Sequence, residues 1–359
     1  TCALPISWSM GLLNEADWQG QWIGLDRPAP GDSETQWSRL AARYLRKEFA
    51  LTKEVKRATV HIAGMGLYEL FINGQRIGEQ VLAPAPTDYR KTILYNTYDV
   101  TPQLQKENAI GVILGNGRFY TMRQNYKPYK IPTFGYPKLR LNLIVEYTDG
   151  SRQTIASDIS WKLTTEGPIR SNNEYDGEEY DARKELGDWN RTGYDDTNWI
   201  PAGRVSIPSG TLRAQMMPGM KVTESLKPVS IRKQGDKQIL DIGQNMAGWL
   251  RIRIKGQAGD SIRLRFAERL QPDGEIFTKN LRDAHCTDIY VVSGREPQDA
   301  TWAPRFVYHG FRYVEISGYP NAKTEDFTAE VVDDEMAHTG TFTCSDETLN
   351  QVLRNALDR

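Results

Sequence analysis

The sequence predicts an all-β protein built from two β-sandwich or jelly-roll domains, and three observations support this. Apolar and polar residues alternate along many short runs, which is the pattern of strands with one buried face. Asn73-Gly74 and Asp149-Gly150 separate such runs, and these dipeptides are strong hairpin turn signals. The runs recur at short spacing over most of the 359 residues, as in sandwiches and jelly rolls.

Two series of strand-like runs follow each other along the chain. In the first, ATVHIAGMGLYELFINGQRIG alternates on both sides of a glycine pair, and PKLRLNLIVEYTDGSRQTIASD predicts a hairpin. In the second, GWLRIRIKGQAGDSIRLRFAERL contains two alternating runs around a glycine-rich turn, followed by TDIYVVSG and FRYVEISGY. We therefore expect one domain for each series.

The segments around these two series suggest the domain boundaries. Residues 203–230 contain three prolines and three glycines without a sustained period, which predicts an interdomain connection. We expect residues 1–35 to be the tail of an upstream domain or a linker. The two β-domains would then span residues 36–205 and 206–335.

The C-terminal residues 336–359 predict a helix in an otherwise β-rich chain. Ser345 is the expected N-cap, and acidic residues follow it in the first turn. The apolar residues then fall on one helical stripe. That stripe consists of Leu349, Val352, Leu353, Ala356 and Leu357, and no other segment of the sequence is an obvious partner for it.

Composition excludes several classes of function. The 45 basic and 46 acidic residues are well mixed, which gives no electrostatic basis for binding nucleic acid or an anionic membrane. No apolar run approaches 18 residues, so we expect no transmembrane helix. The three cysteines and four histidines show no metal-ligand spacing, so we expect no metal site of the zinc type.

The densest acidic cluster is NNEYDGEEYDAR, residues 172–183, and it leaves three interpretations open. Its carboxylates could be a salt-bridged strand-and-turn segment, ligands for calcium or a sugar, or the acid and base of a glycosidase. The structural interpretation is the one we favour. The cluster comprises Glu174, Asp176, Glu178, Glu179 and Asp181, with Arg183 beside them.

Other candidate features have a structural interpretation as the preferred one. GNGRFY, residues 115–120, predicts a tight turn, because the longer glycine pattern of phosphate loops is absent. His309 could act as an acid or base, but the sequence indicates no orienting partner, so we favour a core or interface histidine. The many tryptophans are expected in the core more often than on a sugar platform.

The ordered phrases of the chain resemble one family. GLYELFINGQRIGEQVLAPAPTDYRKTILYNTYDVT, NAIGVILGNGRFY and NNEYDGEEYDAR are similar to the N-terminal jelly roll of bacterial α-L-rhamnosidases, glycoside hydrolase family 78. The later stretch from ILDIGQNMAGWLRIRIKG to FVYHGFRYVEISGYP resembles the β-sandwich that precedes their catalytic domain. The resemblance implies a galactose-binding-like jelly roll, then a concanavalin-like sandwich, then the first helix of an (α/α)6 barrel.

This resemblance carries implications for the site residues. The family's catalytic acids lie in the barrel, so it implies no catalytic residue in this chain. Some members bind rhamnose with calcium through a jelly roll of this kind, which leaves calcium open here although no cofactor is required. The sugar-binding candidates are Asp88, Tyr89, Asn116, Asn125, Tyr126, Glu178 and Asp181.

The resemblance also implies a function and partners. The chain would be the non-catalytic N-terminal part of an enzyme that removes terminal α-L-rhamnose from plant glycosides or polysaccharides by inversion. Its partners would be rhamnosides and its own C-terminal barrel, packed on residues 206–359. The alternative is a stand-alone rhamnose-binding protein. We expect a periplasmic or extracellular location, with the cytoplasm as the alternative.

Overall fold

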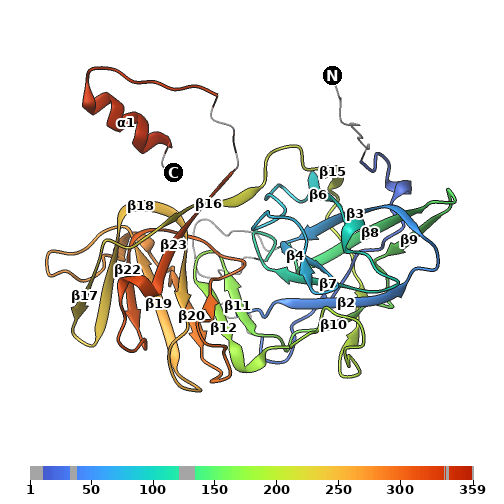
Figure 1. Cartoon of the computed structure of the whole chain (residues 1–359), viewed down its shortest axis with the longest axis horizontal. Helices are drawn as coiled ribbons and strands as arrows, with labels where there is room; N and C mark the ends of the chain where they lie inside the picture. Colours follow the sequence, from blue (N-terminus) through green and yellow to red (C-terminus); the bar gives the residue numbers. More distant parts are fainter. Residues whose placement is uncertain (1–10, 33–38, 121–133, 335, 337–338, 358–359) are drawn as a thin grey trace.

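The computed structural model describes residues 11–32, 39–120, 134–334, 336 and 339–357. Within these ranges the chain forms 23 strands, five 3₁₀ helices and one α-helix. The strands make sheets of seven, six and ten strands, and Figure 1 shows the ten-stranded sheet beside the other two. The predicted all-β fold class is therefore confirmed.

The seven-stranded and six-stranded sheets form the first β-sandwich. The seven-stranded sheet runs in the order β14 (Gly203–Arg204), β1 (Ile23–Gly24), β8 (Lys138–Tyr147), β3 (Val55–Met65), β6 (Thr92–Asp99) and β15 (Thr211–Ala214), with β9 (Arg152–Ala156) paired to β8. The six-stranded sheet runs in the order β13 (Ile200–Pro201), β10 (Lys162–Thr164), β2 (Arg43–Ala50), β7 (Glu107–Gly115), β4 (Leu67–Ile72) and β5 (Gln75–Arg76).

The core of this sandwich is apolar throughout. Its inward side chains come from alternate positions of β3 and β8 on one sheet and of β4 and β7 on the other. Trp161 is its largest fully buried side chain, and its indole N–H donates to the carbonyl oxygen of Ala156 at 2.9 Å. The N-terminal stretch packs on the same unit, because Trp18 and Trp22 are buried against Tyr95 and its neighbours.

The two predicted turn dipeptides form the expected hairpins. Asn73 and Gly74 have φ values of 51° and 83° between β4 and β5, the left-handed pair that favours Asn-Gly in tight hairpins. Asp149 accepts hydrogen bonds from the backbone and hydroxyl of Ser151 at the turn between β8 and β9. The register of both hairpins follows from this turn chemistry.

The ten-stranded sheet belongs mainly to the second half of the chain. It runs in the order β11 (Ile169–Asn173), β12 (Gly177–Asp181), β20 (Thr287–Val291), β19 (Ser261–Ala267), β22 (His309–Ser317), β18 (Lys237–Arg253), β23 (Phe327–Asp334) and β16 (Met220–Leu226). β17 (Ser230–Gln234) and β21 (Thr301–Trp302) also pair with β18. The two runs around the glycine-rich turn, β18 and β19, are not paired with each other, because β22 lies between them.

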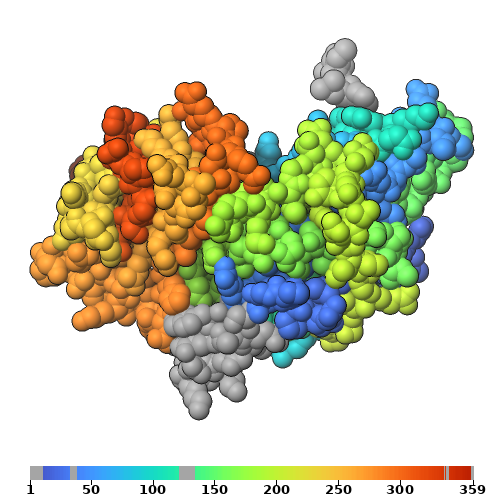
Figure 2. Space-filling view, turned by 90° about the horizontal axis from the view of Figure 1, so that it is seen from below, coloured from blue at the N-terminus to red at the C-terminus, as the bar shows by residue number. Residues whose placement is uncertain are grey.

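Strand exchange links the sandwich to the ten-stranded sheet. The β11–β12 hairpin precedes the predicted boundary at residue 205, yet β12 pairs in parallel with β20. In return, β15 follows that boundary and pairs in parallel with β6 of the sandwich. In Figure 2 the green segment that contains the hairpin lies between the orange strands and the rest of the sandwich. The domain boundaries themselves stay predictions.

The predicted connection, residues 203–230, contains three strands. β14 and β15 join the sandwich, and β16 pairs with β23 of the ten-stranded sheet. Their side chains are mostly exposed, which explains why the segment shows no hydrophobic period. The 3₁₀ helices are η1 (Glu15–Asp17), η2 (Thr101–Gln103), η3 (Ala182–Lys184), η4 (Lys279–Leu281) and η5 (Thr324–Asp326).

The predicted C-terminal helix forms as α1 (Glu347–Leu357) and stands apart from the sheets in Figure 1. Its cap is Asp346 and not Ser345: the Asp346 carboxylate accepts the backbone N–H groups of Thr348 and Leu349. Two residues of the predicted stripe are exposed, Leu349 at 52% and Val352 at 59%. Leu349 and Val352 therefore have little cover in the described part of the chain, whereas Leu353 is half-buried.

Candidate functional site

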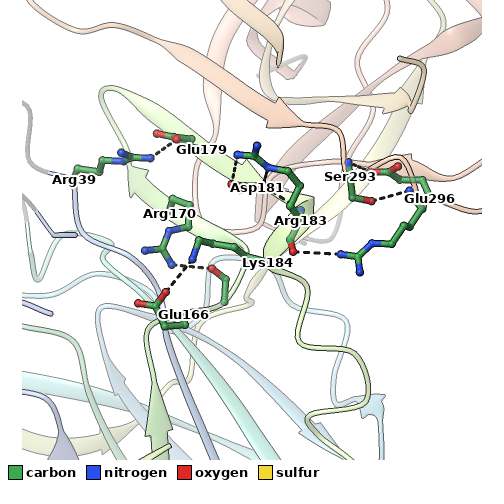
Figure 3. Close-up of polar contacts among 11 residues, drawn as sticks. Arg39, Glu166, Arg170, Glu179, Asp181, Arg183, Lys184, Ser293 and Glu296 are labelled. Atoms are coloured by element: carbon green, nitrogen blue, oxygen red, sulfur yellow. Dashed lines mark hydrogen bonds and ion pairs between the residues drawn. The ribbon is translucent and has the colours of Figure 1, made fainter. Parts of the chain in front are cut away.

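The acidic cluster of residues 172–183 forms the β11–β12 hairpin, and its carboxylates point in different directions. Successive strand residues face opposite sides of a sheet, so the neighbours Glu178 and Glu179 on β12 separate. Glu178 is buried and 1% exposed. Glu179 is half-buried and pairs with the guanidinium of Arg39 on the outer face (Figure 3). The cluster is thus not one converging set of acids.

Glu178 is enclosed by backbone donors from the second half of the chain. Its Oε2 atom accepts the backbone N–H groups of Arg305 and Phe306, each at 3.1 Å. Burial raises the pKa of Glu178 to about 8 against the effect of these donors, and the nearby charge of Asp288 adds to the rise. The group is therefore a buried, mostly protonated carboxyl at neutral pH.

Glu178 belongs to a polar contact between the sandwich and the ten-stranded sheet, which we call the seam and define by Glu69, Glu178, Asp288 and Arg305. Arg305 donates to Glu69 on β4, and Glu69 also accepts from Arg76 at 3.1 Å. Asp288 on β20 is fully buried and accepts the backbone N–H of Glu178 at 2.9 Å. Asp288 and the segment around Arg305 thus hold the exchanged hairpin, and the pair of Arg305 with Glu69 connects that segment to the sandwich.

His309 has an orienting partner that the sequence did not indicate. Its Nε2 lies 3.0 Å from Asp288 Oδ1, and its Nδ1 lies 3.3 Å from Cys286 Sγ. The ring stacks on Phe266 with 4.2 Å between centroids. The favoured interpretation as a buried core or interface histidine agrees with its 3% exposure.

Asp181 ends β12 and serves local structure. It is the N-cap of η3, accepting from the backbone N–H of Arg183, and it pairs with both ends of the Arg183 guanidinium at 2.8 Å (Figure 3). Hydrogen bonds from Arg183 lower the pKa of Asp181, so it stays ionised at neutral pH. Both predicted sugar ligands, Glu178 and Asp181, therefore have protein donors as partners in this structure, and their role in sugar binding stays a prediction.

The structure brings Asp88 and Tyr89 together in a hollow of about 510 Å³. Gly117, Arg118 and Glu174 line the same hollow, and Arg118 pairs with Glu174 at 3.2 Å. Asp88 is held by Arg90, whose hydrogen bonds lower the pKa of Asp88. The Tyr89 ring is buried against Phe119 and Phe134, and burial raises its pKa.

Asn116 precedes Gly117 of this hollow but is itself buried and does not line it. Its amide N–H donates to the backbone oxygen of Asn172 at 2.8 Å, and its backbone N–H donates to the Asn172 side chain at 2.7 Å. Asn116 thereby ties the turn after β7 to β11. The predicted site residues Asn125 and Tyr126 lie outside the described residues. No three His, Cys, Asp or Glu side chains gather as a metal site within the described ranges.

Sequence reasoning missed a larger cleft of about 790 Å³ beside the seam. Glu69 and Arg76 line it from the sandwich, and Trp302 and Arg305 line it from the other side. These residues are far apart in sequence and belong to no short motif. No signal in a single sequence could have placed them together.

The comparisons with known proteins agree with the order of the two β-units. The profile of the alpha-L-rhamnosidase N-terminal domain matches residues 53–224, and that of the bacterial alpha-L-rhamnosidase concanavalin-like domain matches residues 231–333. The chain carries the N-terminal and concanavalin-like domains of the alpha-L-rhamnosidase family.

Relatives of known sequence and structure share this architecture with the chain. An alpha-L-rhamnosidase of Formosa agariphila is 36% identical over 372 residues, which cover 97% of this chain and 39% of the relative. The structure of an alpha-L-rhamnosidase from Dictyoglumus thermophilum superposes with a TM-score of 0.86 at 40% identity, covering 97% of this chain and 39% of that one. For the enzyme from Aspergillus terreus the TM-score is 0.87 at 37% identity, with coverage of 97% and 40%.

The chain therefore spans about two-fifths of the length of the relatives that it matches. The matched domains are the ones that the sequence was predicted to resemble, namely the N-terminal domains of rhamnosidases. Within the described residues no helix is long and apolar enough to cross a membrane.

Proposed function

We propose that this chain is the non-catalytic N-terminal part of an α-L-rhamnosidase that releases terminal α-L-rhamnose from plant glycosides or polysaccharides. The observation that carries this proposal is the ordered match to an N-terminal and a concanavalin-like rhamnosidase domain in a chain that covers 39% of a full rhamnosidase relative. The chemistry would reside in the part of the enzyme that the chain does not contain, as an (α/α)6 barrel with an inverting acid and base.

The surroundings of three candidate carboxylates support the proposed absence of catalytic residues from this chain. An inverting glycosidase needs two carboxyl groups about 6.5–9.5 Å apart, with room for sugar and water between them. Glu178 is enclosed by backbone donors, while Asp181 and Asp88 are held by the neighbouring Arg183 and Arg90. Each of these acids thus has a local structural partner.

The helix α1 supports a partner domain for this chain. Its exposed Leu349 and Val352 form an apolar face that a helical neighbour would cover. We propose that the catalytic barrel packs on this face and on the adjacent ten-stranded sheet. Residues 206–359 would then be the contact region.

A stand-alone rhamnose-binding protein is the second candidate function. The hollow with Asp88 and Tyr89 favours it, because it is large enough for a monosaccharide and combines apolar and charged walls. Calorimetric titration of the chain with L-rhamnose, with and without calcium, distinguishes a binding module from a scaffold. If rhamnose binds in this hollow, the Asp88→Ala variant should bind it more weakly than the parent chain does.

Hydrolysis of a chromogenic α-L-rhamnoside tests the main proposal. We expect a longer protein that contains this chain to be active and the 359-residue chain alone to be inactive. Activity of the isolated chain would overturn the proposal and return the carboxylates of residues 174–181 to the list of catalytic candidates. If the longer protein were inactive on every α-L-rhamnoside tested, the proposed substrate would be wrong, although the similarity in fold would remain.

A further inference from the structure

The outer face of the ten-stranded sheet carries a charged hollow of about 550 Å³. Strand β19 contributes two arginines to it, because its residues alternate between the two faces of the sheet. Ile262, Leu264 and Phe266 are buried in the core, so the intervening arginines face outward. Four cationic side chains line the hollow, which we call the arginine hollow: those of Arg39, Lys237, Arg263 and Arg265.

Two of these four cations have carboxylate partners. Arg39 pairs with Glu179 of β12 (Figure 3). Lys237 Nζ lies 3.0 Å from Glu315 Oε1. In the register of β19 and β22, Glu315 lies directly across from Arg265, yet its described ion pair is with Lys237. The acidic residues nearest to the β19 arginines are therefore already paired with other cations.

Arg263 and Arg265 have no carboxylate at ion-pair distance among the described residues. Arg265 donates from Nη2 to the hydroxyl of Thr278 in a long contact of 3.4 Å. The two arginines are two positions apart on one strand, which places their Cα atoms about 7 Å from each other. Each guanidinium carries five N–H donors, so both have donors left for a ligand.

Strand β18 carries the same arginine spacing with a different outcome. Arg251 Nε lies 2.6 Å from Glu330 Oε1, and Arg253 Nη1 lies 2.7 Å from Asp299 Oδ1. The arginine pair of β18 is thus neutralised by carboxylates of the chain itself, whereas the pair of β19 is not. This contrast provides a matched control within one sheet.

The other groups of the hollow suit a polar anion. Three acidic side chains line it besides Glu178, which is mostly protonated, so the four cations are in excess. Two hydroxyl side chains lie beside the arginines: Ser317 is across from Arg263, and Thr287 is across from Arg265. Hydroxyl groups exchange hydrogen bonds with sugar hydroxyls, and guanidinium groups donate in pairs to carboxylates.

We propose that the arginine hollow binds an acidic saccharide, with the carboxylates of its uronic acid residues on Arg263 and Arg265. A planar carboxylate accepts two parallel N–H bonds from a guanidinium, which a neutral sugar cannot do. The preference for an anion rests on the two arginines. The choice of a saccharide as its carrier rests on the proposed function, an enzyme of plant glycosides or polysaccharides.

Calorimetric titration of the 359-residue chain with trigalacturonate tests this proposal. Maltotriose is the neutral trisaccharide for comparison, and sodium sulfate is the small anion. We expect trigalacturonate to bind, maltotriose not to bind, and sulfate to bind more weakly than trigalacturonate. Raising the salt concentration from about 0.01 M to about 0.1 M should weaken the binding, because the Debye length falls from about 30 Å to about 10 Å.

Three outcomes of these titrations would overturn the proposal. If trigalacturonate does not bind, or binds no better than maltotriose, the hollow is not a site for acidic saccharides. If sulfate binds as tightly as trigalacturonate, the hollow accepts any small anion and the saccharide is wrong.

Single variants place the binding on the two arginines. Arg263→Gln and Arg265→Gln should each weaken trigalacturonate binding by about tenfold or more, the loss expected for a charge-assisted hydrogen bond. Arg253→Gln, which removes an arginine of β18 that already has a carboxylate partner, should leave the affinity within about twofold. Equal losses in all three variants would contradict the proposed site.

A fourth variant should gain affinity, which a misfolded protein would not do. Glu179→Gln removes a negative charge from the hollow and releases Arg39, so trigalacturonate should bind at least about twofold more tightly. Weaker or unchanged binding by this variant would contradict the proposal.

The same titration on a longer protein that contains this chain separates a ligand site from an internal contact. We expect the longer protein to bind trigalacturonate with the same arginine dependence. If it does not, the hollow is covered by the rest of the enzyme, and the proposal is wrong. Because binding is measured without rhamnoside hydrolysis, failure of this site and failure of the proposed function are distinguishable.

Discussion

The interior of the sandwich and the seam are both buried, but they are built in opposite ways. The sandwich interior consists of aliphatic and aromatic side chains around Trp161. Apolar and polar residues alternate along its strands, so each strand's own sequence indicates which side chains are buried. The seam consists of Glu69, Glu178, Asp288 and Arg305, whose partners lie more than 100 residues apart in several cases. The comparison shows that burial of apolar side chains, which has no preferred direction, stabilises the sandwich. Hydrogen bonds and ion pairs, which need a defined geometry, connect the sandwich to the ten-stranded sheet.

The largest effect should come from the sandwich interior. Trp161→Ala removes a fully buried indole, and we expect it to lower the free energy of unfolding by about 3–5 kcal/mol, because the cavity cannot close completely. Urea denaturation measures this. Ile159→Ala, at a position that is 61% exposed, is the control and should change the free energy by less than about 0.5 kcal/mol.

A smaller but chemically specific effect should come from the seam. Glu178→Ala leaves the backbone N–H groups of Arg305 and Phe306 without their acceptor, and we expect a loss of about 2–4 kcal/mol. Glu178→Gln retains an oxygen acceptor and should lose less than about 1.5 kcal/mol. Equal losses in the two variants would show that the acceptor oxygen is not what Glu178 contributes.

Glu178 of the seam and His309, which contacts Asp288 of the seam, should also make stability depend on pH. The pKa of Glu178 is raised to about 8 and that of His309 to about 10, so the folded state holds both protons more tightly than the unfolded state. Their contribution is complete below the unfolded pKa values and is lost as pH rises through 8 and then 10. We expect stability to fall by up to about 1.4 kcal/mol per pH unit for each group, between about pH 4.5 and 8 for Glu178 and between about pH 6.5 and 10 for His309.

Thermal unfolding across this pH range measures that dependence. The Glu178→Gln variant should show a shallower decline between pH 6 and 8, since it has no carboxyl proton to lose. A decline that is as steep in the variant as in the parent chain would assign the pH dependence to other groups.

The smallest effect should come from the helix α1. Leu349→Gln with Val352→Gln changes two exposed side chains, so the free energy of unfolding of this chain should change by less than about 0.5 kcal/mol. In a longer protein whose barrel covers this face, the same pair should lower stability by about 2 kcal/mol or more. A negligible effect in both proteins would contradict the proposed barrel contact.

The sequence predicted the parts of the fold that depend on local pattern. Strand alternation and the Asn73-Gly74 turn indicated the sandwich, and the stripe of Leu349 and Val352 indicated α1. The helix cap was wrong by one residue, because serine and aspartate at positions 345 and 346 are both good caps and only the hydrogen bonds distinguish them.

The candidate site could be predicted much less well. Asp88 and Tyr89 do line one hollow. Glu178 and Asp181 were predicted as sugar ligands because they belong to an acidic cluster, and in the fold both have protein hydrogen-bond partners. Their partners, such as Arg305 for Glu178, are separated by 127 residues. A single sequence contains no local signal for a contact of that range.

The most direct test of this account is hydrolysis of a chromogenic α-L-rhamnoside by the longer protein with Glu178→Gln, measured beside its parent. If Glu178 joins the two β-units and the chemistry lies elsewhere, the variant should keep a rate within a factor of about two while its unfolding midpoint falls slightly. A catalytic carboxylate would instead lose about 100-fold or more on conversion to the amide. Such a loss in a variant of unchanged stability would contradict the structural role of the seam.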